Sequence, residues 1–317
     1  MVKTANKIYI DDLLQLLKDC EFSNDTKNIF FDHISQINET EPNSLSWLSP
    51  IRKDKASLYG NTKVPILICD KNDIPCNEYN PNIKLHIFYK NPKIIFANIL
   101  NFAFSEPDDQ DKIHPTAIIH PNAKLHPSVK VGAYSIIGDC IIGANTIIKN
   151  HVTINTAVEI GNHVVIYEYC SIGSDGFGFA KDDDDRLIKL KHIGKVIIED
   201  EVEIFPHANV DKGTLKKTHI KKGAKIDHYC HIGHNSTIGE NSMITANVIL
   251  CGGASVGSNC MLGVGSIIKE AVNVGDKVTI GLGAVVTKNV PDNETWTGNP
   301  ARELNEFIKT QQKIKNL

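Results

Sequence analysis

An aliphatic residue recurs at every sixth position along most of this chain, and this period limits the fold more than any other feature. The longest series places Ile, Leu or Val at all twelve sixth positions from Ile220 to Val286. Two shorter series precede it, one from Ile113 to Ile137 and, after a slip of one position, one from Ile142 to Ile172. A glycine often follows the aliphatic residue. Such self-similarity at a fixed period is the signature of a repeat architecture.

The repeat predicts a mainly β fold, a triangular parallel β-helix. Each six-residue unit can form one short strand and a corner, and three units complete one coil. The aliphatic side chains then point inward and stack, while glycine or asparagine occupies the corners that need a positive φ. An ordinary sandwich of alternating strands is the alternative.

Two segments interrupt the period. Residues 173–197 begin with several glycines and continue through an acidic tip to an alternating exit, which predicts a loop or hairpin ejected from the coil. Ejected loops on a rigid scaffold are commonly functional. The second break, at residues 211–219, is shorter.

The first 105 residues carry no such repeat and predict a small α/β domain. We expect a short helix over residues 8–20, strands within 44–50 and 64–73, and a strand followed by a helix within 84–104.

The β-helix is expected to span residues 113–290, after a polar linker at 106–112. Residues 302–317 have the apolar spacing of a short amphipathic C-terminal helix.

Composition excludes several classes of function. The 317 residues carry 34 Lys and Arg against 37 Asp and Glu, a net charge of −3 that argues against a nucleic-acid partner. No apolar run is long enough to cross a bilayer, and acidic residues from position 11 onward do not suit a signal peptide. The eight cysteines form no CxxC pair, as expected of reduced thiols. We therefore expect a cytoplasmic protein without a transmembrane segment.

Three histidines form the strongest chemical signal. His228, His231 and His234 recur at every third position. They could be metal ligands, although no nearby Cys or carboxylate completes a known ligand spacing and the three would point in different directions. They could simply lie on the surface. The third alternative is that His234 is a general base, with Asp227 close enough to fix its tautomer and to raise the pKa of the imidazole.

The chain resembles the UDP-3-O-acylglucosamine N-acyltransferases of lipid A synthesis. The resemblance rests on the segments GSDGFGFA, HIGKVIIED, the turn DKG and KIDHYCHIGHNSTIG, and on SLSWLSP and NPKIIFANIL in the N-terminal part. It implies a left-handed β-helix of hexapeptide repeats, a uridine-binding N-terminal domain and a homotrimer. It also implies that His234 is the catalytic base, that Asp227 orients it, and that Trp47 stacks on the nucleobase.

Further site residues come from the loop and from the repeat. Asp175, Gly176 and Phe177 are expected to contact substrate, since glycine lets the backbone approach a ligand closely. We add His231 and Asn235 to the substrate-binding residues. The developing oxyanion needs a donor, and the backbone N–H of a glycine-rich corner such as Gly252 is a candidate.

Departures from the family's pattern concern the acceptor and the acyl donor. Ala271, beside Glu270, stands where the family has a second histidine, and Ile51 and its neighbours replace an aromatic. The sequence GNPAR, which also resembles the closing motif of acetyltransferases that use coenzyme A, is followed by only 15 residues, Glu303 to Leu317, whereas the family has a long C-terminal extension that helps to recruit acyl-carrier protein.

The resemblance implies transfer of an acyl group from a thioester to the amino group of a nucleotide-linked amino sugar, for lipopolysaccharide or surface-glycan synthesis. The thioester is acyl-carrier protein or acyl-coenzyme A, used as a co-substrate, and no tightly bound cofactor or metal is expected. One alternative is a dTDP-linked amino-deoxysugar as acceptor with acyl-coenzyme A as donor. An alternative of another class is a non-catalytic or metal-binding β-helix protein.

Overall fold

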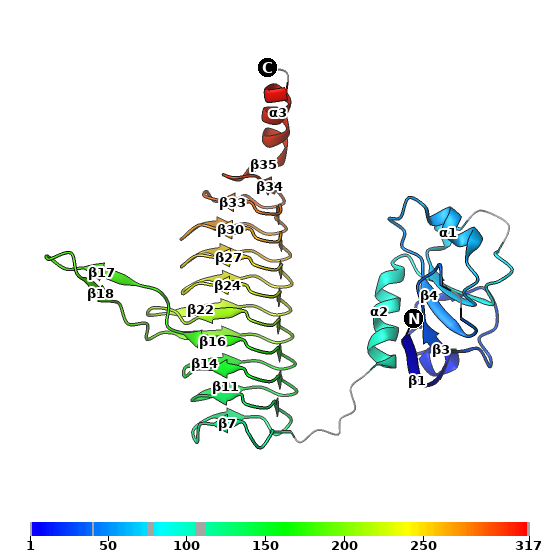
Figure 1. Ribbon diagram of the computed structural model, residues 1–317, viewed down its shortest axis with the longest axis horizontal. Helices are drawn as coiled ribbons and strands as arrows, with labels where there is room; N and C mark the ends of the chain where they lie inside the picture. The colour runs from blue at the N-terminus through cyan, green and yellow to red at the C-terminus, as the bar shows by residue number, and fades with distance from the viewer. Residues whose placement is uncertain (1, 40, 75–78, 105–111, 316–317) are drawn as a thin grey trace. The chain divides into compact units, whose positions relative to one another are not determined.

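A computed structural model describes residues 2–39, 41–74, 79–104 and 112–315 of the chain. The chain divides into two compact units, Met1–Gln110 and Asp111–Leu317 (Figure 1). The polar linker expected at 106–112 lies almost wholly outside the described residues. No helix within the described ranges is long and apolar enough to span a membrane.

The first unit is a mixed sheet with two helices. Its strands lie in the order β1-β3-β4-β5-β6-β2, and β3, β4, β5 and β6 pair in parallel. The elements are β1 (Val2–Tyr9), η1 (Ile10–Leu13), β2 (Glu21–Phe22), β3 (Phe30–Ile34), β4 (Ser44–Trp47), α1 (Lys55–Asn61), β5 (Ile66–Cys69), η2 (Lys71–Asp73), β6 (Leu85–Phe88) and α2 (Pro92–Ala103).

One local prediction in this unit is wrong. Residues 8–20 do not form a single helix, because β1 ends only at Tyr9 and the single 3-10 turn η1 follows. Ile10, Leu13 and Leu17 nevertheless point into the core, so the apolar spacing that suggested a helix reflects burial around that turn.

The second unit is a parallel β-helix, and the predicted fold class is confirmed (Figure 1). Three parallel sheets form its sides, and each coil contributes one strand to each sheet. The first side contains β7 (Ile118–Ile119), β10 (Ile136–Ile137), β13 (Thr153–Ile154), β16 (Ser171–Ser174), β21 (Asn209–Asp211), β24 (His231–Ile232), β27 (Ile249–Leu250), β30 (Ile267–Ile268) and β33 (Val285–Val286).

The other two sides are built in the same way. The second contains β8 (Lys124–Leu125), β11 (Cys140–Ile142), β14 (Val158–Ile160), β19 (Lys195–Ile198), β22 (Lys217–Ile220), β25 (Thr237–Ile238), β28 (Ser255–Val256) and β31 (Asn273–Val274). The third contains β9 (Lys130–Val131), β12 (Ile147–Ile148), β15 (Val165–Ile166), β20 (Glu203–Ile204), β23 (Lys225–Ile226), β26 (Met243–Ile244), β29 (Met261–Leu262), β32 (Thr279–Ile280), β34 (Thr295–Thr297) and β35 (Arg302–Glu303). The last of these strands, β35, pairs antiparallel with β34, and the helix α3 (Leu304–Lys315) follows it.

The six-residue aliphatics fill the interior of the coil. All twelve members of the series from Ile220 to Val286 are buried, and they belong to one continuous core cluster. The glycines that follow them have a different role from the one expected, because they allow adjacent coils to stack closely rather than supplying a positive φ. A Cβ at Gly239, for example, would lie 2.3 Å from the carbonyl oxygen of Gly257 in the next coil.

One corner of the β-helix carries a column of stacked rings. Tyr134, His151, Tyr169, His207 and Tyr229 adopt φ values of 58 to 64° in successive coils. Their ring centroids are 5.2, 5.0, 4.9 and 4.8 Å apart in that order. Stacking at this corner thus stabilises a backbone conformation that residues other than glycine and asparagine rarely adopt.

A long excursion leaves the β-helix between β16 and β19. We call residues 175–194 the arm. It contains the antiparallel hairpin of β17 (Phe179–Lys181) and β18 (Leu187–Lys189), which projects from the side of the β-helix (Figure 1). Its acidic tip is locally paired, because Arg186 contacts Asp182 and Asp184.

The inward aliphatics should determine the stability of the β-helix. In β11, Ile142 is 1% exposed whereas its neighbour Ile141 is 51% exposed. We expect Ile142→Ala to lower the free energy of unfolding by about 2–5 kcal/mol, because it leaves a cavity between coils. Ile141→Ala, the matched control, should cost well under half as much in urea or thermal unfolding. Equal losses for the two variants would contradict the inward column as the source of stability.

Candidate active site

His234 lies at a corner after β24, where the arm rejoins the β-helix. Its ring is 4.8 Å from that of His192, in an edge-to-face arrangement at 60°. Two glycines adjoin the ring. A Cβ at Gly176 would lie 2.8 Å from Cδ2, and one at Gly252 would lie 2.6 Å from Nε2. Both glycines predicted for the site therefore contact the predicted base.

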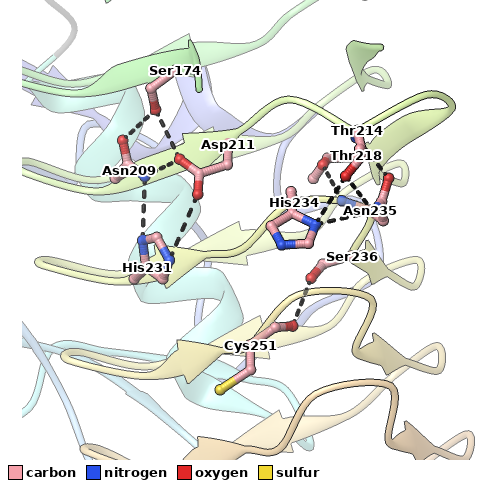
Figure 2. Close-up of polar contacts among 10 residues, drawn as sticks. All are labelled: Ser174, Asn209, Asp211, Thr214, Thr218, His231, His234, Asn235, Ser236 and Cys251. Carbon is pink, nitrogen blue, oxygen red and sulfur yellow. Dashed lines mark hydrogen bonds and ion pairs between the residues drawn. The ribbon is translucent and has the colours of Figure 1, made fainter. Parts of the chain in front are cut away.

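Nδ1 of His234 has two polar neighbours, and each is compatible with a different neutral tautomer of the ring. Thr214 Oγ1 is 3.4 Å from Nδ1, and Asn235 Nδ2 is 2.9 Å from it (Figure 2). A proton on Nδ1 can be donated to the threonine hydroxyl, which leaves the lone pair of Nε2 free. The Asn235 amide donates to Nδ1 in the other neutral tautomer. The Thr214 N–H donates to Asn235 Oδ1 over 2.9 Å and so fixes the orientation of that amide.

Asp227 does not orient His234 in this chain, and that prediction is wrong. Oδ1 of Asp227 lies 2.6 Å from Nδ1 of His228 and also accepts the backbone N–H of His228. Burial raises the pKa of Asp227, but the hydrogen bonds from His228 outweigh it and leave the pKa below its ordinary value. Asp227 follows β23, at the corner before β24, whereas His234 lies at the corner after it. The two side chains therefore leave different corners of the coil.

The surroundings of His234 lower the pKa of its ring. Burial, and after it the nearby His192 imidazole, lower the pKa of His234 below the ordinary 6.5, against the opposing effect of Asp211 and Glu270. The sequence alone suggested an upward shift caused by Asp227, and the structure reverses that direction. His192 is itself buried, and its Nδ1 lies 3.1 Å from the Leu190 carbonyl. Its Nε2 has no hydrogen-bond partner among the described residues.

A pocket of about 410 Å³ opens beside these groups, between the arm and the first side of the β-helix. Predicted site residues line it: Asp175, Gly176 and Phe177 from the arm and His231 from β24. Asp175 pairs with Lys212 at 2.8 Å and Lys189 at 2.9 Å. The hydrogen bonds from Lys212 and then Lys189 lower the pKa of Asp175 to about 2.

The sequence did not single out the polar network on the floor of this pocket. Asn209 and Asp211 of β21, Ser174 of β16 and His231 of β24 come from three neighbouring strands and meet on one face (Figure 2). Asn209 Nδ2 donates to Asp211 Oδ1 over 2.7 Å and lies 3.2 Å from His231 Nδ1. The DKG turn contained Asp211, and this was the available signal. His192 opens the segment HIGKVIIED, which carried the resemblance in the same way, whereas Thr214 gave no such signal; both residues reach the site only through the fold.

Trp47 lies in the first unit and is half-buried at the end of β4. Its ring stacks on Phe96 of α2, with centroids 5.9 Å apart, and lines a pocket of about 610 Å³. Ser35 and Ser46 also line this pocket. Their hydroxyls are buried and lack a hydrogen-bond partner among the described residues. Trp47 thus packs on the core and also faces a pocket with polar groups.

Comparison with known proteins agrees with the fold. A family model described as bacterial transferase hexapeptide (six repeats) matches residues 217–252. The UDP-N-acetylglucosamine O-acyltransferase of Moraxella catarrhalis superposes with a TM-score of 0.56 and 27% identity, over 63% of this chain and 78% of that one. The repeat and the fold thus make the chain a parallel β-helix of hexapeptide repeats, similar to those of bacterial hexapeptide transferases.

Within that class, the chain is similar to proteins named UDP-3-O-acylglucosamine N-acyltransferase, and the resemblance stated from the sequence is confirmed. That of Sinorhizobium fredii is 49% identical over 176 residues, 56% of this chain and 48% of the relative. That of Coxiella burnetii is 28% identical over 233 residues, 67% of this chain and 66% of the relative. That of Helicobacter hepaticus is 34% identical and matches 45% of its own length. The matched region thus spans about half to two thirds of these curated relatives.

The titration of His234 offers a direct check on the site. We expect its imidazole to titrate below 6.5, because burial and His192 disfavour the charged ring. His192→Asn removes the like-charged neighbour and should raise the pKa of His234. His163→Asn, at an exposed histidine elsewhere on the β-helix, is the control and should leave it unchanged. The measurement is a pH titration of the histidine ring signals by NMR. A pKa of His234 at or above 6.5 in the native chain would contradict the expected effect of burial and of His192 on this ring.

Proposed function

We propose that this chain is an N-acyltransferase that moves an acyl group from a thioester to the amino group of a nucleotide-linked amino sugar. The observation that carries the proposal is the position of the His234 ring between Gly176 and Gly252, the first of which also lines an open pocket. Similarity to proteins named UDP-3-O-acylglucosamine N-acyltransferase supports a UDP-linked glucosamine as the acceptor. The thioester is an acyl-carrier protein or acyl-coenzyme A.

The reaction requires a base that is unprotonated near neutral pH. The acceptor nitrogen attacks the thioester carbonyl, the new C–N bond forms, and the nitrogen loses a proton to Nε2 of His234. The tetrahedral intermediate then breaks its C–S bond, and the thiolate leaves and takes up a proton. The lowered pKa of His234 keeps its ring available as the acceptor of the first proton.

The oxyanion of that intermediate needs a hydrogen-bond donor close to the base. We assign this role to the backbone N–H of Gly252, whose missing side chain leaves room beside Nε2. We assign acceptor binding to Asp175, Gly176 and Phe177 of the arm, together with His231. Nε2 of His234 can accept the proton in the tautomer whose Nδ1 proton is donated to Thr214 Oγ1, and Asn235 lies beside the same edge of the ring.

The nucleobase is assigned to the first unit. Trp47 lines a pocket that also holds the unpartnered hydroxyls of Ser35 and Ser46. An aromatic ring with hydrogen-bonding groups nearby suits a flat base with polar edges.

The wider context of the reaction is also a proposal. We propose a homotrimer, since closed symmetry is the common solution for soluble oligomers and the relatives' scaffold is shared. We place the enzyme in the cytoplasm, in lipopolysaccharide or lipid A synthesis. A dTDP-linked amino-deoxysugar is the acceptor to compare in the same assay.

Substitution of the base tests the mechanism. We expect His234→Ala to lower kcat by about 10²–10⁴, with KM within a few-fold, because the lost interaction belongs to the transition state. The measurement is release of free thiol from an acyl thioester with UDP-3-O-acylglucosamine as acceptor. Asp227→Asn is the control and should retain most of the activity, since Asp227 contacts His228 instead. A His234→Ala variant with near-native kcat would exclude the proposed base.

Substitution of the aromatic tests nucleotide binding. We expect Trp47→Ala to raise KM for the nucleotide sugar roughly 10-fold with little change in kcat, because stacking on a base is worth about 1–3 kcal/mol. Trp47→Phe should restore most of the affinity. If Trp47→Ala instead unfolds at much lower temperature with an unchanged KM, Trp47 is only a core residue.

A further inference from the structure

The pocket beside His234 contains a buried carboxylate that the acyl transfer described above does not use. Asp211 is 4% exposed and lines the pocket with His231. Its Oδ1 lies 2.9 Å from the Ser174 hydroxyl and 2.7 Å from the Asn209 amide nitrogen (Figure 2). Within the described chain, Oδ2 makes no such hydrogen bond and has Nε2 of His231 at 3.8 Å. One oxygen of Asp211 is therefore held in place while the other keeps its capacity to accept hydrogen bonds.

Among the described residues, Asp211 has no lysine partner. Asp175, the other pocket carboxylate, already pairs with Lys189 and Lys212. Besides His231, the titratable groups nearby are His234 and His192, with Glu270 acting on His234 from a later coil. A buried carboxylate is costly unless a cation or several donors compensate it. The pocket therefore suits a ligand that brings a positive charge to Asp211.

We infer that Asp211 binds the ammonium form of the acceptor's amino group and so selects an amine over a hydroxyl acceptor. This inference rests on the proposed function and names the residue that sets its acceptor class. An ammonium offers three N–H donors and a charge, and a charge-assisted hydrogen bond is stronger than a neutral one. A hydroxyl at the same carbon offers one donor and no charge. Asp211 thus acts on binding. The bound ammonium first gives one proton to solvent, the neutral amine that results attacks the carbonyl, and Nε2 of His234 accepts the second proton as the C–N bond forms.

The substitution Asp211→Asn removes the negative charge of the side chain while it keeps the size and shape of that side chain. The amide keeps an oxygen for Ser174 and Asn209 and places an N–H₂ donor where Oδ2 stood, so it no longer attracts an ammonium. The probes are UDP-glucosamine and UDP-glucose, which differ by amine against hydroxyl at one carbon, and the measurement is their dissociation constants by calorimetry. We expect the native chain to prefer UDP-glucosamine, and Asp211→Asn to reduce that preference roughly 10- to 100-fold.

Two controls distinguish selection from a general defect. Asp227→Asn removes a carboxylate that is paired with His228 outside this pocket, and it should keep the native preference. His234→Ala should lose turnover and also keep the preference. The native preference should weaken as the pH rises above the pKa of the sugar amine, and this measurement needs no variant that might fail to fold.

Each outcome bears on the inference. An unchanged preference in folded Asp211→Asn overturns it, as does a native preference that is independent of pH. If the native chain transfers acyl groups to the amine while Asp211→Asn keeps its KM, the inference fails and the proposed function stands. If the native chain binds neither sugar and transfers no acyl group, the proposed acceptor class fails and the inference fails with it.

Discussion

Burial of one aliphatic side chain per six residues is the interaction on which the rest of the second unit depends. The short strands have little stability alone, because each contributes only two to four residues to its sheet. They persist because every coil stacks its inward residues on those of the coils beside it, in one continuous core. The glycines that follow the aliphatics allow this stacking, since a side chain there would meet the backbone of the next coil. The coil is therefore rigid, and its corners hold side chains at fixed spacings.

The candidate site exploits that rigidity. His234, Asn235 and Gly252 sit at equivalent corners of adjacent coils, while the floor of the pocket comes from three paired strands. The arm adds the remaining groups and brings His192 against the His234 ring. In the part of the chain that the structure describes, no carboxylate hydrogen-bonds to the His234 ring, and its polar neighbours at Nδ1 are a hydroxyl and an amide. The resulting centre favours a neutral imidazole, which suits a base that must accept a proton from an amine.

The sequence predicts the β-helix well because its period is visible in the chain itself. The aliphatic series from Ile220 to Val286 coincides with the core of the β-helix, because the position equivalent to each inward residue in the next coil is also aliphatic. The site is less accessible to such reasoning. Asp227 is seven residues from His234, but a corner of the coil separates the directions in which the two side chains leave the backbone. His192 and Asp211 join the site through the return of the arm and the pairing of β21 with β24. Apolar spacing also misled in residues 8–20, where a strand end and a 3-10 turn bury the same side chains that a helix would.

The eighteen-residue coil has a consequence for how such a chain can change in length. His231 pairs with Ile249, Ile249 with Ile267 and Ile267 with Val285, so equivalent positions recur once per coil. Loss of a single six-residue unit between His231 and Gly252 would rotate everything beyond it by one side of the triangle, and Gly252 would no longer lie beside the His234 ring. Loss of a whole eighteen-residue coil would leave the remaining strands on the same sides of the β-helix but would shorten it by one coil. Growth is tolerated where a segment leaves and re-enters at the same corner, as the arm does, and there new contacts to a substrate can be added without disturbing the register of the rest.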